Sequence, residues 1–325
     1  MCKVVANILM VAVVVVGLFV APITAEAIDF PNKPVTLVVP YGTGGASDVL
    51  ARALGSKLST KWDQTVIIAN RPGASTTIGA GVVARARPDG YTLLLGVPPL
   101  VTSLYIYDQP PYTKDSFEPI SYVATYPFVL AVGKDSKFNS LAALIEHART
   151  NPGMTYASVG AGSTPHLVGE LFARSANLKL NHIPYTSGGQ ATIDLRAGRI
   201  GFYAGHPLEV LPQLKDGGVR ALTVLSRERL AVLPGVPSAA EVGYPQLEAS
   251  GWTAILAPKG TPSEIVEKIS SDVRDVIKDP TFASVFESQG AIFIGSGPAE
   301  LSALLAAEHA KYGPLIKAIG IKLAE

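Results

Sequence analysis

Residues 35–48 read VTLVVPYGTGGASD, a short apolar run that passes through glycines into a stretch patterned like a helix. Val35 to Val39 is typical of a buried strand, and apolar residues then recur at helical spacing from Val49 to Leu58. Where a strand enters a helix through such a turn, unpaired backbone N–H groups lie at the positive end of the helix dipole. Glycines let an acidic ligand approach the main chain, so this turn can hold an anion.

A second glycine-rich turn, residues 158–166 (SVGAGSTPH), also follows a strand-like run and opens a helix-patterned stretch. Thr164 followed by Pro165 is typical of the N-cap and N1 positions of a helix. His166 is either a donor to an anion or a histidine satisfied by backbone at the helix start. Hydroxyls that can donate to carboxylate oxygens come from Ser158, Ser163 and Thr164. Two such turns facing each other across a crevice would hold a small carboxylate from both sides.

Two further turns follow strand-like runs, and ligands of open α/β sheets collect at the edge where such turns lie. Residues 184–190 (PYTSGGQ) offer polar side chains, and residues 96–99 (GVPP) offer apolar contact. The predicted ligand-binding residues are Tyr41, Gly44, Gly45, Ala46, Ser47, Asp48, Val97, Pro98, Ser158, Gly160, Gly162, Ser163, Thr164, His166, Tyr185, Thr186 and Ser187.

Asp48 suits the helix dipole, but its charge would repel a carboxylate bound to the same amides. We therefore interpret it as a helix cap, or as a partner for a ligand amine or water. The first turn lacks the third glycine of the dinucleotide-binding motif, and the sequence contains no phosphate-binding GxxxxGK[ST] motif. The alternative for this first turn is a tight strand-to-helix connection that binds nothing.

Strand and helix patterns alternate twice along the chain, over residues 35–95 and again over residues 128–225. This order predicts an α/β fold of two mostly parallel sheets with helices on both faces. A strand-like run at residues 251–257 and helical patterns over residues 263–319 are expected to pack back on the first domain. We therefore expect two domains: a discontinuous domain 1 (residues 28–128 and 250–325) and a domain 2 (residues 129–249). The chain crosses between them twice, and such a double crossing forms a hinge.

The first 27 residues read as an export signal, because Lys3 precedes an apolar run and Ala25-Glu26-Ala27 has the pattern that signal peptidase cleaves. A transmembrane anchor is the alternative, but the run from Ile8 to Val20 is shorter than the ~20 residues that span a bilayer. Export predicts a periplasmic protein. The one cysteine, Cys2, lies in this segment, so the mature chain has no disulfide or thiol chemistry.

The chain carries 27 basic and 26 acidic residues, and the basic ones are scattered singly. This pattern excludes the basic stripe that nucleic-acid binding needs. The five histidines have no metal-ligand spacing, and the sequence lacks the common zinc and hydrolase motifs, so we expect no metal, no cofactor and no catalytic residue. A hydrolase using Ser163 and His166 is the enzymatic alternative, although the pair has no acid to orient it.

Short motifs spread along the mature chain carry a resemblance to one family. They lie at residues 31–35 (PNKPV), 39–41 with Gly44, Gly45 and Asp48, 70–74 (NRPGA), 88–94 (PDGYTLL), 156–158 with 162–167, 184–185, 220–222, 233–237 (LPGVP), 252 and 257–262. Together they resemble the solute-binding receptors of tripartite tricarboxylate transporters, the Bug-type periplasmic binding proteins. The resemblance covers essentially the whole mature length.

The resemblance implies a Venus-flytrap receptor that passes its ligand to a membrane transporter made of a large and a small subunit. In this family, backbone amides and bridging waters of the two glycine-rich turns hold a ligand carboxylate. The corresponding residues here run from Tyr41 to Asp48 and from Ser158 to His166. The chain departs from the family pattern on the expected crevice wall, at Thr43, Ser75-Thr76, Thr102-Ser103 and Thr186-Ser187.

The sequence thus predicts an exported, monomeric receptor for a small carboxylate: a di- or tricarboxylate, an acidic amino acid or an aromatic acid. An accessory that reports the ligand to a membrane sensor kinase would use the same pocket and is the principal alternative.

Overall fold

The computed structural model describes residues 29–323, and the expected export signal of residues 1–27 lies outside this range. The first elements are β1 (Val35–Val39), α1 (Ala46–Trp62), β2 (Val66–Asn70), α2 (Thr77–Ala84), β3 (Thr92–Gly96), α3 (Pro99–Ile106) and β4 (Phe117–Pro127). The middle of the chain forms β5 (Val129–Gly133), α4 (Leu141–Thr150), β6 (Met154–Ser158), α5 (Thr164–Ser175), β7 (Leu180–Pro184), α6 (Gly188–Arg196), β8 (Phe202–Gly205), α7 (Pro207–Lys215) and β9 (Val219–Val224). The last elements are β10 (Ser250–Pro258), α8 (Ser263–Ile277), α9 (Pro280–Glu287), β11 (Ile292–Ser296) and α10 (Pro298–Ile319).

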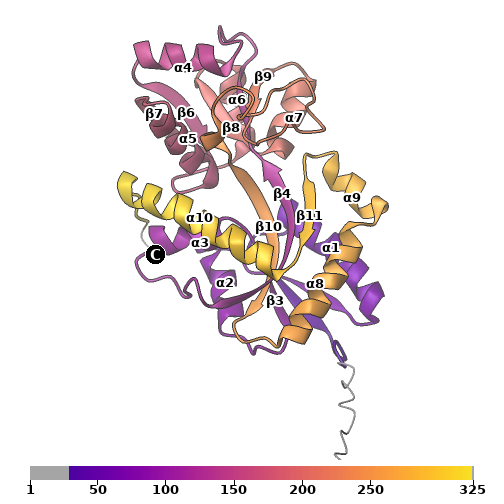
Figure 1. The fold of residues 1–325 in the computed structure, drawn as a ribbon. Helices are drawn as coiled ribbons and strands as arrows, with labels where there is room; N and C mark the ends of the chain where they lie inside the picture. The colour runs from indigo at the N-terminus through magenta and orange to yellow at the C-terminus, as the bar shows by residue number, and fades with distance from the viewer. Residues whose placement is uncertain (1–28, 324–325) are drawn as a thin grey trace, which may run out of the picture.

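The strands form two sheets, one in each lobe of the molecule (Figure 1), with the orders β11-β4-β10-β3-β1-β2 and β7-β6-β8-β5-β9. β1 pairs in parallel with β2 and β3, and β6 pairs in parallel with β7 and β8. The antiparallel pairs all involve β4, β5 or β10. Each sheet is therefore mixed, with a parallel half built from βαβ units and an antiparallel half at the strands that lead between the lobes.

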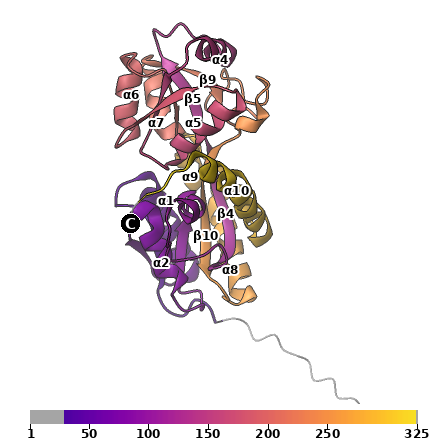
Figure 2. The same ribbon diagram turned by 90° about the vertical axis from the view of Figure 1, so that its left-hand side faces the viewer.

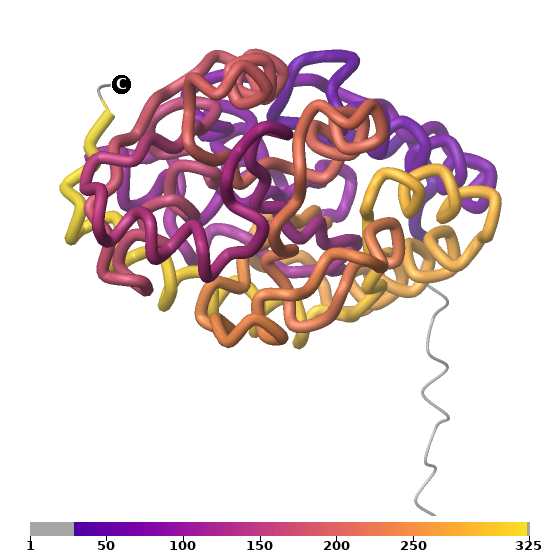
Figure 3. Tube along the Cα trace, turned by 90° about the horizontal axis from the view of Figure 1, so that it is seen from above, coloured from indigo at the N-terminus to yellow at the C-terminus, as the bar shows by residue number. Residues whose placement is uncertain are grey.

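The chain passes between the two sheets at two places. It leaves the first sheet at Pro127, the end of β4, and enters the second at Val129, the start of β5. It returns at Ser250, where β10 begins, and β10 pairs along β4, so the two connections lie side by side (Figures 1 and 2). The second lobe overlies much of the first when the molecule is seen from above (Figure 3).

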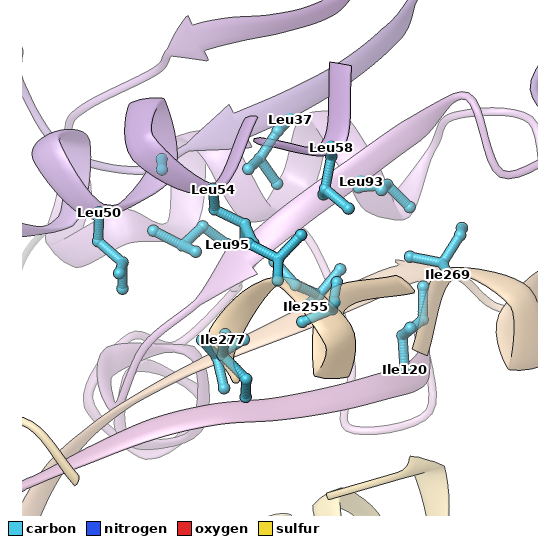
Figure 4. Packing of buried hydrophobic residues seen from close by; sticks show 14 of the residues in the cluster. Leu37, Leu50, Leu54, Leu58, Leu93, Leu95, Ile120, Ile255, Ile269 and Ile277 are labelled. Carbon is cyan, nitrogen blue, oxygen red and sulfur yellow. The ribbon is translucent and has the colours of Figure 1, made fainter. Parts of the chain in front are cut away.

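The core of the first lobe holds α1 and α8 against its sheet. Leu50, Leu54 and Leu58 of α1 recur every four residues and are buried, which places them on one helix face. They lie among apolar side chains of the strands and α8, including Leu37, Leu93, Leu95, Ile255, Ile269 and Ile277 (Figure 4). This packing fixes the α1 N-terminus at the edge of the sheet.

The structure contains three elements that the sequence patterns did not predict: α3, β4 and β11. β4 contains Glu118 and Pro119, which interrupt a strand pattern, but it pairs with both β10 and β11. β11 is an edge strand, and Gly295 has a φ of +61° beside the register irregularity of its pairing with β4. Both segments therefore form strands because they pair with segments that are distant in sequence.

Candidate functional site

A cavity of about 390 Å³ lies between the two lobes, within the size range of small-molecule sites. From the first lobe and the crossing strands it is lined by Tyr41, Ala46, Ser47, Val97, Pro98, Pro99, Tyr126, Phe128, Gly251, Trp252 and Thr253. From the second lobe it is lined by Val159, Ser163, Thr164, Pro165, His206, Leu208 and Glu209. Seven predicted residues lie in this lining, namely Tyr41, Ala46, Ser47, Val97, Pro98, Ser163 and Thr164.

The N-terminus of α1 opens into this cavity. The helix begins at Ala46 after the N-cap Gly45, and the Val49 amide donates to the Gly45 carbonyl at 3.0 Å. The amides of Ala46, Ser47 and Asp48 precede this bond and therefore have no intrahelical acceptor. Since Ala46 and Ser47 line the cavity, the positive end of the α1 dipole is presented to a bound ligand.

Asp48 lies outside the cavity lining and stabilises the first turn by hydrogen bonds. Its buried carboxylate accepts hydrogen bonds from the Gly44 amide, Arg52 Nε and Asn70 Nδ2, each at 2.9 Å. The Arg52 hydrogen bond is the largest of the causes that lower the pKa of Asp48 to about 2. Asp48 accepts from the Gly44 amide, which precedes the N-cap, and not from an N-terminal amide of α1, so its contacts tie the turn to β2 and to α1 without capping the helix.

The N-terminus of α5 reaches the same cavity from the second lobe. Ser163 is the N-cap and Thr164 the first helical residue, so the helix starts one position earlier than the Thr164-Pro165 pair predicts. Pro165 has no N–H, and the Leu167 amide bonds back to the Ser163 carbonyl at 3.0 Å. Thr164 and His166 therefore carry the amides without an intrahelical acceptor.

Side chains of the second turn mainly hold its own backbone. Ser163 Oγ donates to the Gly160 carbonyl at 2.6 Å, and His166 Nδ1 accepts from the Gly162 amide at 2.9 Å. Ser158 Oγ donates to the Gly160 carbonyl at 2.9 Å, in a turn where Gly160 has a φ of +115°. Ser163 and His166 thus bind different backbone groups, which is a structural arrangement and not that of a nucleophile with its base.

His166 and His182 stack in parallel beneath this turn. Their ring centroids are 3.8 Å apart with an interplanar angle of 9°, and His182 Nε2 lies 2.6 Å from Ser158 Oγ. Burial, followed by the charge of His182, lowers the pKa of His166 to about 4, and burial also lowers the pKa of His182. Both rings are neutral at pH 7, so His166 can accept the Gly162 hydrogen bond.

The third turn does not reach the cavity. Tyr185 donates to Asp194 Oδ2 at 2.8 Å, Thr186 donates to Gln190 Oε1 at 2.7 Å, and Ser187 caps α6 by accepting from the Gln190 amide. The Glu209 carboxyl group lies over Gly188, where a Cβ atom would come within 2.2 Å of it. The N-terminus of α6 therefore already has an acid from the protein beside it, whereas those of α1 and α5 open into the cavity.

Ten predicted residues lie outside the lining, in the turns behind it or in the third turn: Gly44, Gly45, Asp48, Ser158, Gly160, Gly162, His166, Tyr185, Thr186 and Ser187. Eleven lining residues were not predicted: Pro99, Tyr126, Phe128, Val159, Pro165, His206, Leu208, Gly251, Trp252, Thr253 and Glu209. Several of these belong to the crossing strands or to the start of α7, where the sequence shows no glycine-rich signal.

Within residues 29–323, no group of three or more His, Cys, Asp or Glu side chains is placed to hold a metal ion. Among these residues, no helix combines the length and apolarity that crossing a membrane requires.

The two lobes are joined by paired crossing strands, and each lobe presents a helix N-terminus to one shared cavity. This arrangement is that of a solute-binding protein of the periplasmic binding protein class. The family model described as "Tripartite tricarboxylate transporter family receptor" matches residues 50–321. The chain belongs to this family, which consists of receptors and not of enzymes.

Individual relatives agree with this assignment. BugT of Bordetella pertussis is 34% identical over 319 residues, covering 95% of this chain and 97% of the relative. A solved R. palustris structure with adipate has a TM-score of 0.78 and 33% identity, covering 91% of this chain and 100% of that one. MatC from Rhodopseudomonas palustris with bound malate has a TM-score of 0.73 and 27% identity, covering 88% of this chain and 100% of that one.

Proposed function

We propose that this protein captures a small organic carboxylate between its lobes and delivers it to a tripartite tricarboxylate-type membrane transporter. The observation that carries the proposal is the shared cavity, because it receives the unpaired N-terminal amides of α1 and α5 from opposite sides. Each helix terminus contributes about 0.3 to 2 kcal/mol to anion binding, so burial and closure of the lobes supply the remainder of a micromolar affinity.

The same proposal covers the setting in which the protein works. The lobes act as domain 1 (residues 28–128 and 250–325) and domain 2 (residues 129–249), and they close about the two crossings when the ligand binds. The receptor acts as a monomer in the periplasm after removal of an export signal, and it presents the closed form to the large and small transporter subunits. Family membership and the double crossing support this account.

The experiment compares two substitutions that add the same charge to the same helix. Ser47→Asp places a carboxylate at the α1 N-terminus, where it stabilises the helix but repels a ligand anion. We expect the free energy of unfolding to stay equal or rise slightly, and the affinity for a carboxylate to fall about tenfold or more. Calorimetric titration with a carboxylate that protects the wild type against heating measures this loss.

Ser56→Asp is the matched control, because Ser56 is exposed on α1 and lies outside the cavity lining. This control should bind as the wild type does. Equal binding by wild type and Ser47→Asp, or no thermal protection of the wild type by any carboxylate, would overturn the proposed function.

A further inference from the structure

Beyond the two helix N-termini, the cavity is lined mainly by aromatic and apolar side chains. Trp252 donates its Nε1–H to Glu308 Oε2 at 2.8 Å, and Glu308 on α10 lies outside the lining. The indole N–H is therefore used away from the cavity, and the ring of Trp252, a residue that is only 2% exposed, borders the cavity. Tyr126 and Phe128 add two more rings, with centroids 4.9 and 6.1 Å from that of His206. Such ring surfaces favour stacked or edge-on contact with another ring.

The charges around the cavity give no support for a second ligand carboxylate. Its described lining residues include no Lys or Arg, and the ionisable groups besides tyrosine are His206 and Glu209. The Leu208 amide donates to His206 Nδ1 at 3.4 Å, and burial lowers the pKa of His206 to about 4, so the ring is neutral at pH 7.

Glu209 makes this end of the cavity unfavourable for an anion. Its carboxyl group accepts from the Tyr203 hydroxyl at 2.6 Å and from the His206 amide at 3.2 Å, and burial raises its pKa. A second carboxylate on the ligand would lose its hydration and meet an acid and a neutral imidazole. An unpaired buried charge of this kind costs several kcal/mol.

We propose that the ligand is a monocarboxylate with an uncharged aromatic body, whose acid group binds the α1 and α5 N-termini while its ring contacts Tyr126, Phe128 and Trp252. This inference rests on the proposed function and specifies its substrate class. It separates the protein from its neighbours that hold adipate and malate, because both of those ligands are diacids.

The test titrates the wild-type protein with benzoate, phenylacetate and cinnamate, and with malate, adipate and citrate. Benzamide, which keeps the ring but lacks the charge, is the control for the acid group. We expect the best aromatic acid to bind about tenfold or more tightly than any of the di- and tricarboxylates, and benzamide not to bind. Preferential binding of a di- or tricarboxylate would overturn the substrate class and leave the proposed function intact. Binding of no acid would overturn both.

A charge substitution tests the reason for this preference. Leu208, the second residue of α7, is 37% exposed and lines the cavity, so Leu208→Lys supplies the missing cation at small cost to packing. We expect the dissociation constants of malate or adipate to fall about tenfold in this variant. Ile193→Lys adds the same charge on α6 at a residue that is 63% exposed and outside the lining, and it should bind like the wild type. A folded Leu208→Lys protein with unchanged diacid binding would contradict the charge argument.

Discussion

At the scale of single residues, polar groups near the two turns divide into those that hold the protein together and those that remain for a ligand. Asp48, Ser158 and His166 satisfy backbone or side-chain partners within their own turns. The groups left over include main-chain amides at the starts of α1 and α5. In the proposed function, these side chains build the shape of the site and the backbone amides recognise the charge of the ligand.

Asp48→Ala removes the acceptor for three hydrogen bonds at a buried position. We expect the free energy of unfolding to fall by about 2 kcal/mol or more, because the Gly44 amide and Asn70 lose their partner. Asp48→Asn should lose less, since an amide oxygen remains. Because the folded pKa is about 2, this stabilisation is complete above the ordinary value of 3.8 and is lost as the pH falls toward 2. Urea unfolding of both variants measures the losses, and an alanine variant as stable as the wild type would contradict this role.

At the scale of elements, the sequence predicted most helices and strands because each βαβ unit carries its own local pattern. Val35–Val39 and the helix after it illustrate this, since apolar spacing and a glycine turn suffice to define them. The sequence did not predict β4, nor that Tyr126, Phe128 and Trp252 line the cavity, and the reason is the same for both. Both depend on β10 lying beside β4, a contact between segments distant in sequence that no local pattern contains. The third turn was predicted to belong to the site because its sequence pattern matches those of the other two turns. The pattern does not show that Glu209, a residue of α7, lies beside this turn.

The stacked histidines beneath the second turn make the stability of that element depend on pH. The folded pKa of His166 is about 4, below its ordinary value of 6.5, so the unfolded chain binds more protons between these two values. Stability is therefore full above pH 6.5 and falls as the pH drops toward 4, by about 2 to 3 kcal/mol for this one group. Protonated His166 also cannot accept from the Gly162 amide. His166→Gln should flatten the pH dependence of the unfolding free energy in this interval, and an unchanged slope would contradict the assignment.

At the scale of the whole molecule, the cavity sits where the chain passes between the lobes. Tyr126 at the end of β4 and Trp252 near the start of β10 belong to the two paired crossing strands and also line the cavity. A ligand held there contacts both lobes and both connections at once. In the proposed function, closure about the crossings buries the ligand together with Tyr126 and Trp252, which couples binding to the arrangement of the lobes.

This coupling predicts an optical signal from one tryptophan of the two in the chain. Trp252 lines the cavity between the lobes, whereas Trp62 lies in the core of the first lobe and donates to Asp272 Oδ2 at 2.7 Å. Binding of a protecting carboxylate should change the emission of Trp252, because the ligand places a charge and new atoms beside this buried ring at the cavity, and should leave Trp62 unaffected. Fluorescence titration of Trp62→Phe should therefore retain the full signal, and Trp252→Phe should lose it. A signal that survives in Trp252→Phe and disappears in Trp62→Phe would place the binding event away from the crossing strands.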